Sequence, residues 1–327
     1  MMNVMVSICV VTYQHAKYIR QALDSFLAQK CDFDFEILIH DDASTDGAAD
    51  IIAEYEQRYP DKIRAILQKE NQYSQGITNI SGAFNFPRAR GKYIALCDGD
   101  DYWCDENKLA IQVAYMEKHL DCMLCVHSAK VVNDNGDFID RNLMRPYQKN
   151  TVLSPKQVLD KKGAFAFGSM LLRKEVVEDL PHYYVDCPVG DRPLELMAIE
   201  RGNVYYIDRP MSAYRFNGAG SWTSSMKSGD YQRKQEVYAR QMSKMYKEFD
   251  QKTNYRFHRE AVLAAHRLFF LTRVNLRDFT SIYQPKYRRF YRELPRRERF
   301  FIAFEYRLPT LYRLMQNWSH KMRNGHG

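Results

Sequence analysis

The spacing of hydrophobic residues in the first third of the chain alternates between two periods. Short β-branched runs predict strands at residues 6–12, 35–40, 63–68 and 93–97. Between these runs, apolar residues three and four positions apart predict helices at residues 18–29 and 48–59. Strands that alternate with helices predict a mostly parallel sheet with helices on both faces, so we expect an α/β fold.

The pattern is less regular further along the chain. We expect helices near residues 107–119 and 193–201, strands near 123–133 and 168–172, and mostly loops at 140–162. A glycine- and serine-rich segment follows at residues 214–228, and from residue 231 the apolar residues recur at helical spacing. We therefore expect a first domain of residues 1–228 and a helical extension of residues 229–327.

Composition excludes several classes of protein. The chain has 327 residues, of which 45% are hydrophobic and 27% charged, as in globular proteins. No apolar run approaches the roughly 18 residues of a membrane-spanning helix. The seven cysteines lack the paired spacing of zinc sites, and the first residues do not resemble a secretory leader. We therefore expect a cytoplasmic protein with free thiols.

Charge is distributed unevenly along the chain. The net charge is +8, but residues 1–230 hold 26 basic and 32 acidic residues, whereas residues 231–327 hold 22 basic and 8 acidic residues. The basic character therefore belongs to the extension. Such segregation indicates an acidic partner surface, which could be nucleic acid, anionic lipid or an acidic polymer.

An acidic run, CDGDDYW, directly follows the predicted strand at residues 93–97. Asp98, Asp100 and Asp101 repel one another unless a divalent cation or strong donors neutralise them. Their oxygen ligands suit Mg²⁺ or Mn²⁺, ions that proteins often hold with one or two carboxylates and substrate phosphates. The alternative is an acidic surface turn. Because ligands bind beyond the carboxyl ends of parallel strands, this run lies where a site is expected.

A second acidic run, HDDASTDG, follows the strand at residues 35–40. Its Ser, Thr and Asp residues can cap the next helix, whereas Asp42 can also accept hydrogen bonds from a base or a ribose. Neither G-x-G-x-x-G nor the P-loop pattern follows the first strand, which disfavours dinucleotide and P-loop nucleotide sites.

Four segments, in this order, resemble inverting glycosyltransferases of family 2, which have the GT-A fold: SICVVTYQHAKYIRQALDSFLAQ, DDASTDG, GKYIALCDGDDYW with NKLAIQV, and GDRPLELMAIERGNVYYIDRPMSAYR. They cover most of residues 6–216. The resemblance implies a GT-A domain, with a mostly parallel central sheet flanked by helices, that binds a nucleotide-sugar donor.

The resemblance also implies a role for each matching residue. The donor contacts are Thr12 and Tyr13 at the base, Asp42 at the base or ribose, Asp98 at the ribose or sugar, and Gly99, where the backbone approaches. Asp100 would bind Mg²⁺ or Mn²⁺ at the diphosphate, and Asp101 would be either a further ligand or a turn cap.

The resemblance places the catalytic base in an acidic pair before a helix. Here that pair reads Gly190-Asp191, so Asp191 is the expected base and Glu195, one helical turn away, is the reserve. In the loop expected to close over the donor, Arg215 would contact the diphosphate and Trp222 would cap the sugar. A structural ion pair is the alternative for Arg215.

These residues together predict transfer of one sugar from a UDP- or dTDP-type donor to an acceptor hydroxyl in bacterial surface polysaccharide synthesis. The Q-x-x-R-W motif of processive synthases is absent from the sequence. A sugar-nucleotide pyrophosphorylase would need a basic, glycine-rich loop after the first strand, which is also absent. The non-enzymatic alternative is a nucleotide- or nucleic-acid-binding protein that uses the basic extension.

The end of the extension carries an apolar stripe flanked by basic residues. Its members are Phe301, Phe304, Leu308, Leu311, Met315 and Trp318. Apolar anchors with Arg and Lys around them suit the anionic inner face of a membrane, on which many lipid-linked sugar acceptors lie. Alternatively, the stripe packs on the catalytic domain or on another subunit of a homo-oligomer. Pro309 is expected to interrupt it.

Overall fold

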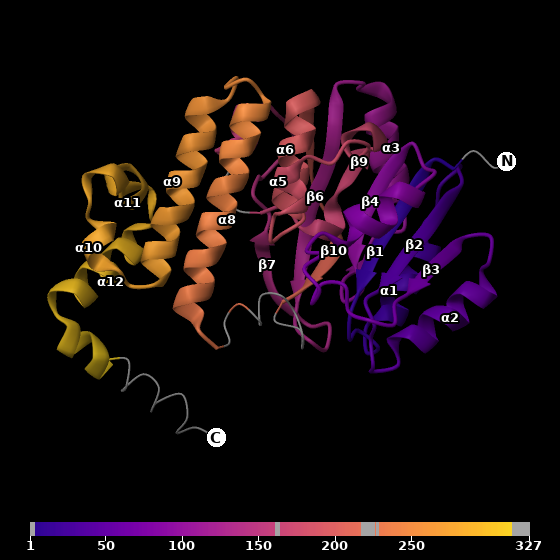
Figure 1. Ribbon diagram of the computed structural model, residues 1–327, viewed down its shortest axis with the longest axis horizontal. Coiled ribbons are helices and arrows are strands. Elements are labelled where there is room, and N and C mark those ends of the chain that lie inside the picture. The colour runs from indigo at the N-terminus through magenta and orange to yellow at the C-terminus, as the bar shows by residue number, and fades with distance from the viewer. Residues whose placement is uncertain (1–3, 161–163, 217–225, 227–228, 316–327) are drawn as a thin grey trace.

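The computed structural model describes residues 4–160, 164–216, 226 and 229–315. Its core is one mixed sheet in the order β3-β2-β1-β4-β9-β6-β10-β5, with β7 beside β6 and β8 beside β10 (Figure 1). The strands are β1 (Val6–Thr12), β2 (Phe35–Asp41), β3 (Ile63–Leu67), β4 (Tyr93–Asp98), β5 (Tyr102–Trp103), β6 (Cys122–Val132), β7 (Phe138–Met144), β8 (Thr151–Leu153), β9 (Leu171–Arg173) and β10 (Asn203–Arg215).

The first four strands are parallel, as the sequence predicts. β1 lies between β2 and β4, and β2 pairs with β3. Their side chains are buried on both faces because helices cover the sheet on each side: Val6, Ile8 and Val10 lie in one apolar cluster, while Cys9 lies in the other. β9 then joins β4 to β6 through antiparallel pairs, which makes the complete sheet mixed.

The helices divide between the two faces of the sheet. α1 (Ile19–Leu27), α2 (Ala48–Arg58) and α3 (Lys108–Lys118) pack with one apolar cluster, whereas α4 (Pro155–Leu159), α5 (His182–Val185) and α6 (Asp191–Arg201) pack with the other. Short helical turns complete this part of the chain: η1 (Ser81–Asn85), η2 (Phe86–Arg88), η3 (Phe167–Ser169) and η4 (Lys174–Val176).

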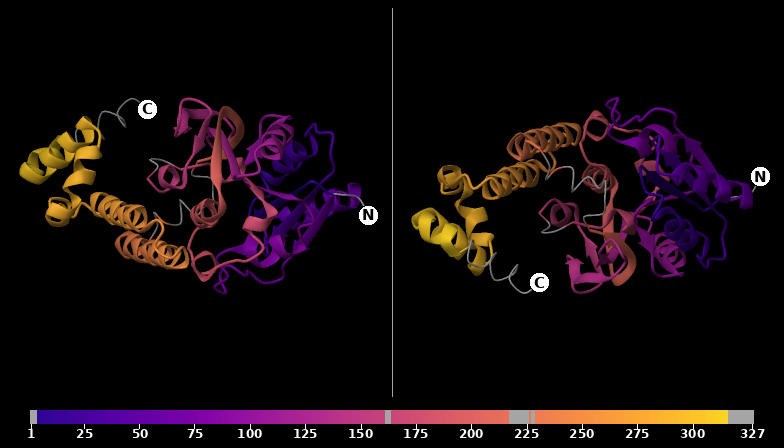
Figure 2. Two further views of the ribbon diagram at one scale, coloured as in Figure 1. Left: turned by 90° about the horizontal axis from the view of Figure 1, so that it is seen from above. Right: turned by 90° about the horizontal axis from the view of Figure 1, so that it is seen from below.

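The extension is helical, as predicted, and its elements are α8 (Tyr231–Lys252), α9 (His258–Asn275), α10 (Phe279–Ile282), η5 (Pro285–Tyr287), α11 (Arg288–Glu293) and α12 (Arg296–Arg307). α8 and the first half of α9 share the apolar cluster of α6, and Phe249 of α8 is fully buried there. α10 to α12 lie further out and form a small core with the end of α9 (Figures 1 and 2). The boundary at residue 228 stays a prediction.

Two details of the sequence prediction are wrong. The segment 140–162 is not mostly loop, because it contains the end of β7 together with β8 and α4. The expected strand at 168–172 begins only at Leu171, after the turn η3. The sequence analysis also missed β10, whose pairing with β6 shifts register between Ile207 and Ser212, around Pro210. None of the helices in the described ranges has the length and hydrophobicity needed to span a bilayer.

Candidate functional site

The site is built on the carboxyl edge of β1, β2 and β4. In register, Thr12 at the end of β1 pairs with Asp41 of β2, and Val11 pairs with Asp98 of β4. The connecting loops are held to the same edge, because the Asp42 amide donates to the Thr12 carbonyl at 3.0 Å and the Gly99 amide donates to the Val11 carbonyl at 2.9 Å. Three predicted donor contacts, Thr12, Asp42 and Asp98, therefore lie side by side.

Gly99 lets the acidic turn pack directly on β1. A Cβ atom at this position would lie 2.7 Å from both Cβ and Oγ1 of Thr12, which is too close for any other residue. The Thr12 hydroxyl is buried and has no hydrogen-bond partner in the described part of the chain. The structure thus gives Gly99 a packing reason, the Thr12 side chain, while its approach to a donor stays a prediction.

Three carboxylates meet at the acidic turn after β4. Burial, the charge of Asp100 and the charge of Asp191 raise the pKa of Asp98 to about 8. Burial and the charges of Asp100 and Asp98 likewise raise the pKa of Asp101 far above its ordinary value. The turn therefore holds more negative charge than its surroundings stabilise, which is the condition that favours a bound cation.

This donor set fits a divalent cation that is shared with a substrate. Within the described residues, no three His, Cys, Asp or Glu side chains form a complete metal site. Asp98 and Asp100 would supply one or two carboxylate ligands, and phosphate oxygens and water would complete the coordination, as is usual for Mg²⁺. His15 Nε2 lies 3.8 Å from Asp100 Oδ2, so an imidazole also faces this carboxylate.

Arg215, at the end of β10, holds the acidic turn in place. Its backbone amide donates to Asp101 Oδ1 at 2.8 Å. Four of the five guanidinium N–H groups have partners at 2.9–3.0 Å. The acceptors are the carbonyls of Asp100, Asn133 and Asp134 and the side chain of Gln21. This side chain is 3% exposed and has a structural role here; its contact with a diphosphate stays a prediction.

Asp42 organises the loop that follows β3. Its Oδ1 accepts from the Gln72 amide at 2.7 Å and its Oδ2 from the Tyr73 amide at 3.0 Å, and the carboxylate is almost fully buried. The predicted contact of Asp42 with a base or ribose would add to these bonds. Tyr13, the residue after β1, is 41% exposed, and its stacking on a base stays a prediction.

Asp191 is the first residue of α6. Its charge contributes to the raised pKa of Asp98, which places the two carboxylates close together although they are distant in sequence. Asp191 Oδ1 also accepts from the Arg192 amide at 2.7 Å. Glu195, the reserve base, is buried in an ion pair with Arg192 and is therefore held away from solvent.

Other polar residues in these loops were missed by the sequence analysis. Gln14 has a positive φ of 59°. Its backbone amide donates to Ser44 Oγ at 2.9 Å, and this bond joins the loops after β1 and β2. His15 follows it and faces Asp100. Both residues lie in the first of the segments that resemble family 2. Their place in that segment is the sequence signal that could have identified them. Trp222 lies outside the described residues.

Replacing Asp98 by Asn should flatten the pH dependence of stability between about pH 4 and pH 8. Because the pKa of Asp98 is raised to about 8 in the folded protein, the native state binds more protons than the unfolded chain in this window. The melting temperature of the parent protein should therefore fall more steeply with rising pH than that of Asp98→Asn, measured in EDTA. Exposed Asp61→Asn is the control; identical pH profiles for the parent and Asp98→Asn would contradict the burial of charge at this turn.

Comparison with known proteins gives an independent view of the chain. The model of glycosyl transferase family 2 matches residues 7–180, which is more than half of the sequence. An uncharacterised protein of Mycobacterium tuberculosis is 34% identical over 231 residues, which cover 67% of this chain but only 61% of the relative. The putative teichuronic acid biosynthesis glycosyltransferase TuaG of Bacillus subtilis is 28% identical over 156 residues, 46% of this chain and 59% of TuaG.

Solved structures show the same fold. Residues 1–349 of S. aureus TarS, in complex with UDP-GlcNAc, superpose with a TM-score of 0.56 at 17% identity, covering 93% of this chain and 91% of that one. The mannosyltransferase PcManGT from Pyrobaculum calidifontis, in complex with GDP-Man and Mn²⁺, gives a TM-score of 0.50 at 15% identity and covers 93% and 87%. These likenesses confirm the predicted GT-A architecture.

Proposed function

This chain belongs to glycosyltransferase family 2, and from that premise we propose that it transfers one sugar from a UDP- or dTDP-linked donor to an acceptor hydroxyl with inversion. The observation that carries the proposal is the meeting of Asp98, at the end of β4, with Asp191, at the start of α6. A donor held at the strand ends would present its sugar between them.

Asp191 is the proposed general base. Its carboxylate would take the proton from the acceptor hydroxyl while the oxygen attacks the anomeric carbon. The new carbon–oxygen bond forms opposite the breaking bond to the diphosphate, so a single displacement inverts the configuration. Glu195 is less suited to this role because its carboxylate is committed to Arg192 in a buried ion pair.

The strand ends would hold the donor. Thr12 and Tyr13 are proposed to contact the base, Asp42 the base or ribose, and Asp98 the ribose or sugar. Asp98 and Asp100 would hold Mg²⁺ or Mn²⁺, an ion that stabilises charge on the diphosphate leaving group when it is bound. PcManGT is described with Mn²⁺ and GDP-Man, and TarS with UDP-GlcNAc, which supports this choice of ligands.

TuaG is named as a putative teichuronic acid biosynthesis glycosyltransferase, and this similarity supports a role in bacterial polysaccharide synthesis. We extend this role to the present chain as a proposal. Acceptor sugars attached to lipids would place the work of the enzyme at the inner face of a membrane. The exposed, basic end of the extension is suited to that surface.

UDP or dTDP with Mn²⁺ should raise the melting temperature of the protein, and neither should do so in Asp100→Ala, which lacks a proposed metal ligand. The matched control is exposed Asp61→Ala, which should respond as the parent does. Stabilisation by an oligonucleotide but by neither nucleotide with Mn²⁺ would contradict the proposal and favour a nucleic-acid-binding protein.

Asp191→Asn should retain nucleotide binding but lose sugar transfer by about 10²–10⁴-fold, the usual contribution of a general base. Release of the nucleoside diphosphate, measured over a panel of UDP- and dTDP-sugars with candidate acceptors, reports the transfer. Glu195→Gln tests the reserve base in the same assay. Its melting temperature checks that this variant folds. Unchanged turnover in Asp191→Asn would remove this residue from the mechanism.

The outer end of the extension is proposed to bind anionic membrane. α12 ends at Arg307, and a second helical segment begins at Pro309, so the predicted interruption is confirmed. From Leu308 onward the chain exposes the large apolar side chains of Leu308, Leu311, Leu314 and Met315. The basic residues Arg307 and Arg313 are near them in the sequence. Part of the predicted stripe packs differently, since Phe301 and Phe304 are only partly exposed; Trp318 lies outside the described residues.

A triple Gln variant at Leu308, Leu311 and Leu314 should float less than the parent protein with vesicles rich in phosphatidylglycerol. The apolar anchors are lost while the charge is unchanged, so the loss reports insertion into the interface. Leu120→Gln, at another strongly exposed leucine, is the control. Equal flotation of all three proteins would contradict the proposal.

A further inference from the structure

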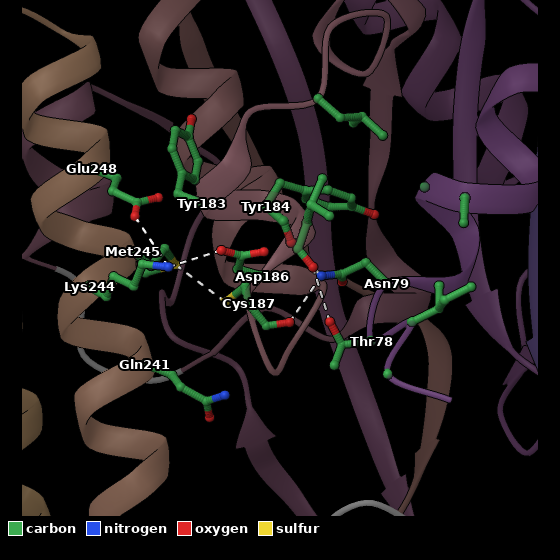
Figure 3. Close-up of a pocket in the computed structure, with 16 residues that line it drawn as sticks. Thr78, Asn79, Tyr183, Tyr184, Asp186, Cys187, Gln241, Lys244, Met245 and Glu248 are labelled. Carbon is green, nitrogen blue, oxygen red and sulfur yellow. Dashed lines mark hydrogen bonds and ion pairs between the residues drawn. The ribbon is translucent and has the colours of Figure 1, made fainter. Parts of the chain in front are cut away.

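A pocket of about 550 Å³, with both apolar and polar lining residues, lies between α8 and α5 with the turn that follows α5. Its volume is in the ordinary range for small-molecule sites. Figure 3 shows side chains from three separate segments around it: the loop before η1, the turn after α5, and one face of α8. The predicted donor contacts are not among the residues that line it.

The wall opposite α8 is fixed by hydrogen bonds between two of these segments. Thr78 Oγ1 donates to the Val185 carbonyl at 3.1 Å. Asn79 Nδ2 donates to the Cys187 carbonyl at 3.0 Å and also to the Tyr184 carbonyl. These bonds tie the loop before η1 to the end of α5 and to the turn after it, so the pocket has a preformed side.

The α8 wall presents hydrogen-bonding groups of both kinds. Gln241, Lys244 and Glu248 are three and four residues apart, so they share one helix face that looks into the pocket (Figure 3). Lys244 Nζ lies 2.9 Å from Asp186 Oδ2 and 3.6 Å from Glu248 Oε1. The Gln241 amide has no hydrogen-bond partner among the described residues. An amide, an ammonium and two carboxylates therefore line one opening.

The start of α6, which carries the proposed catalytic base, lies next to the pocket lining. The charge of Asp191 acts on Cys187, which lines the pocket, and on Tyr238, one turn before Gln241 on α8. A Cβ atom at Gly190, next to Asp191, would lie 3.3 Å from the Asn79 side-chain oxygen. Gly190, the residue before Asp191, therefore lies against Asn79, which lines the pocket.

We propose that this pocket binds a neutral sugar residue of the acceptor, adjacent to the residue whose hydroxyl is attacked. A sugar hydroxyl both donates and accepts, which matches the mixture of an amide, an ammonium and carboxylates. With two carboxylates, Asp186 and Glu248, against one ammonium, Lys244, the lining disfavours phosphate and uronate groups. This inference rests on the proposed glycosyltransferase function, and it makes α8 of the extension part of the acceptor site.

Saturation-transfer NMR with four oligosaccharides tests the proposal. The neutral probes are maltotetraose, mannotetraose and tetra-N-acetylchitotetraose, and the anionic probe is tetragalacturonate. At least one neutral probe should bind at millimolar concentration and more tightly than the anionic one. The Gln241→Ala/Lys244→Ala variant should weaken that binding by about tenfold or more, equivalent to at least 1.4 kcal/mol.

The matched control is Lys247→Ala/Gln251→Ala, which removes the same two residue types from exposed positions of α8 that do not line the pocket. It should bind as the parent does, and melting curves of both variants check folding. Binding of no neutral probe, equal binding by the pocket variant, or preference for tetragalacturonate would each overturn the inference.

Measuring nucleotide binding distinguishes failure of this inference from failure of the glycosyltransferase function on which it rests. Stabilisation of the parent protein by UDP, dTDP or GDP with Mn²⁺ reports the donor site and involves no pocket residue. Nucleotide binding without binding of a neutral probe would reject the pocket alone. Pocket-dependent binding of a tetrasaccharide without any nucleotide response would instead reject the glycosyltransferase proposal.

Discussion

The concentration of carboxylates after β4 is the constraint on which the rest of the site depends. Asp98, Asp100 and Asp101 occupy four consecutive positions together with Gly99, and burial raises the pKa of Asp98 and Asp101. Burying these carboxylates costs free energy. Arg215 opposes that cost, because its backbone and guanidinium groups hold the turn by several hydrogen bonds. A turn that is already held by hydrogen bonds would need little rearrangement to bind the proposed cation and diphosphate.

Each neighbouring element contributes to this arrangement in a different way. Parallel pairing brings the ends of β1, β2 and β4 to one edge, and the contact between Gly99 and Thr12 sets their separation. α6 begins across from that edge and places Asp191 near Asp98. α8 shares a buried core with α6, and one of its faces forms a wall of the pocket.

Local pattern was sufficient to predict the parallel strands, the helices between them and the position of the acidic run at the carboxyl end of a strand; Thr12 was assigned to the site only through the family resemblance. It was insufficient where long-range contacts decide the structure. β10 was missed because Pro210 and the charged residues before it break the alternation at a register shift. A structural role for Arg215 was one of the two interpretations, but its partners could not be predicted because some, such as Gln21, are up to 194 residues away in sequence.

The central claim is that the acidic turn and the donor share one cation. The most direct measurement is anomalous diffraction from crystals grown with Mn²⁺ and UDP. The account predicts an anomalous peak in coordination contact with Asp100 and with the diphosphate, on the side of the turn that faces Asp191. A peak elsewhere in the protein, or a nucleotide bound away from the ends of β1, β2 and β4, would contradict it.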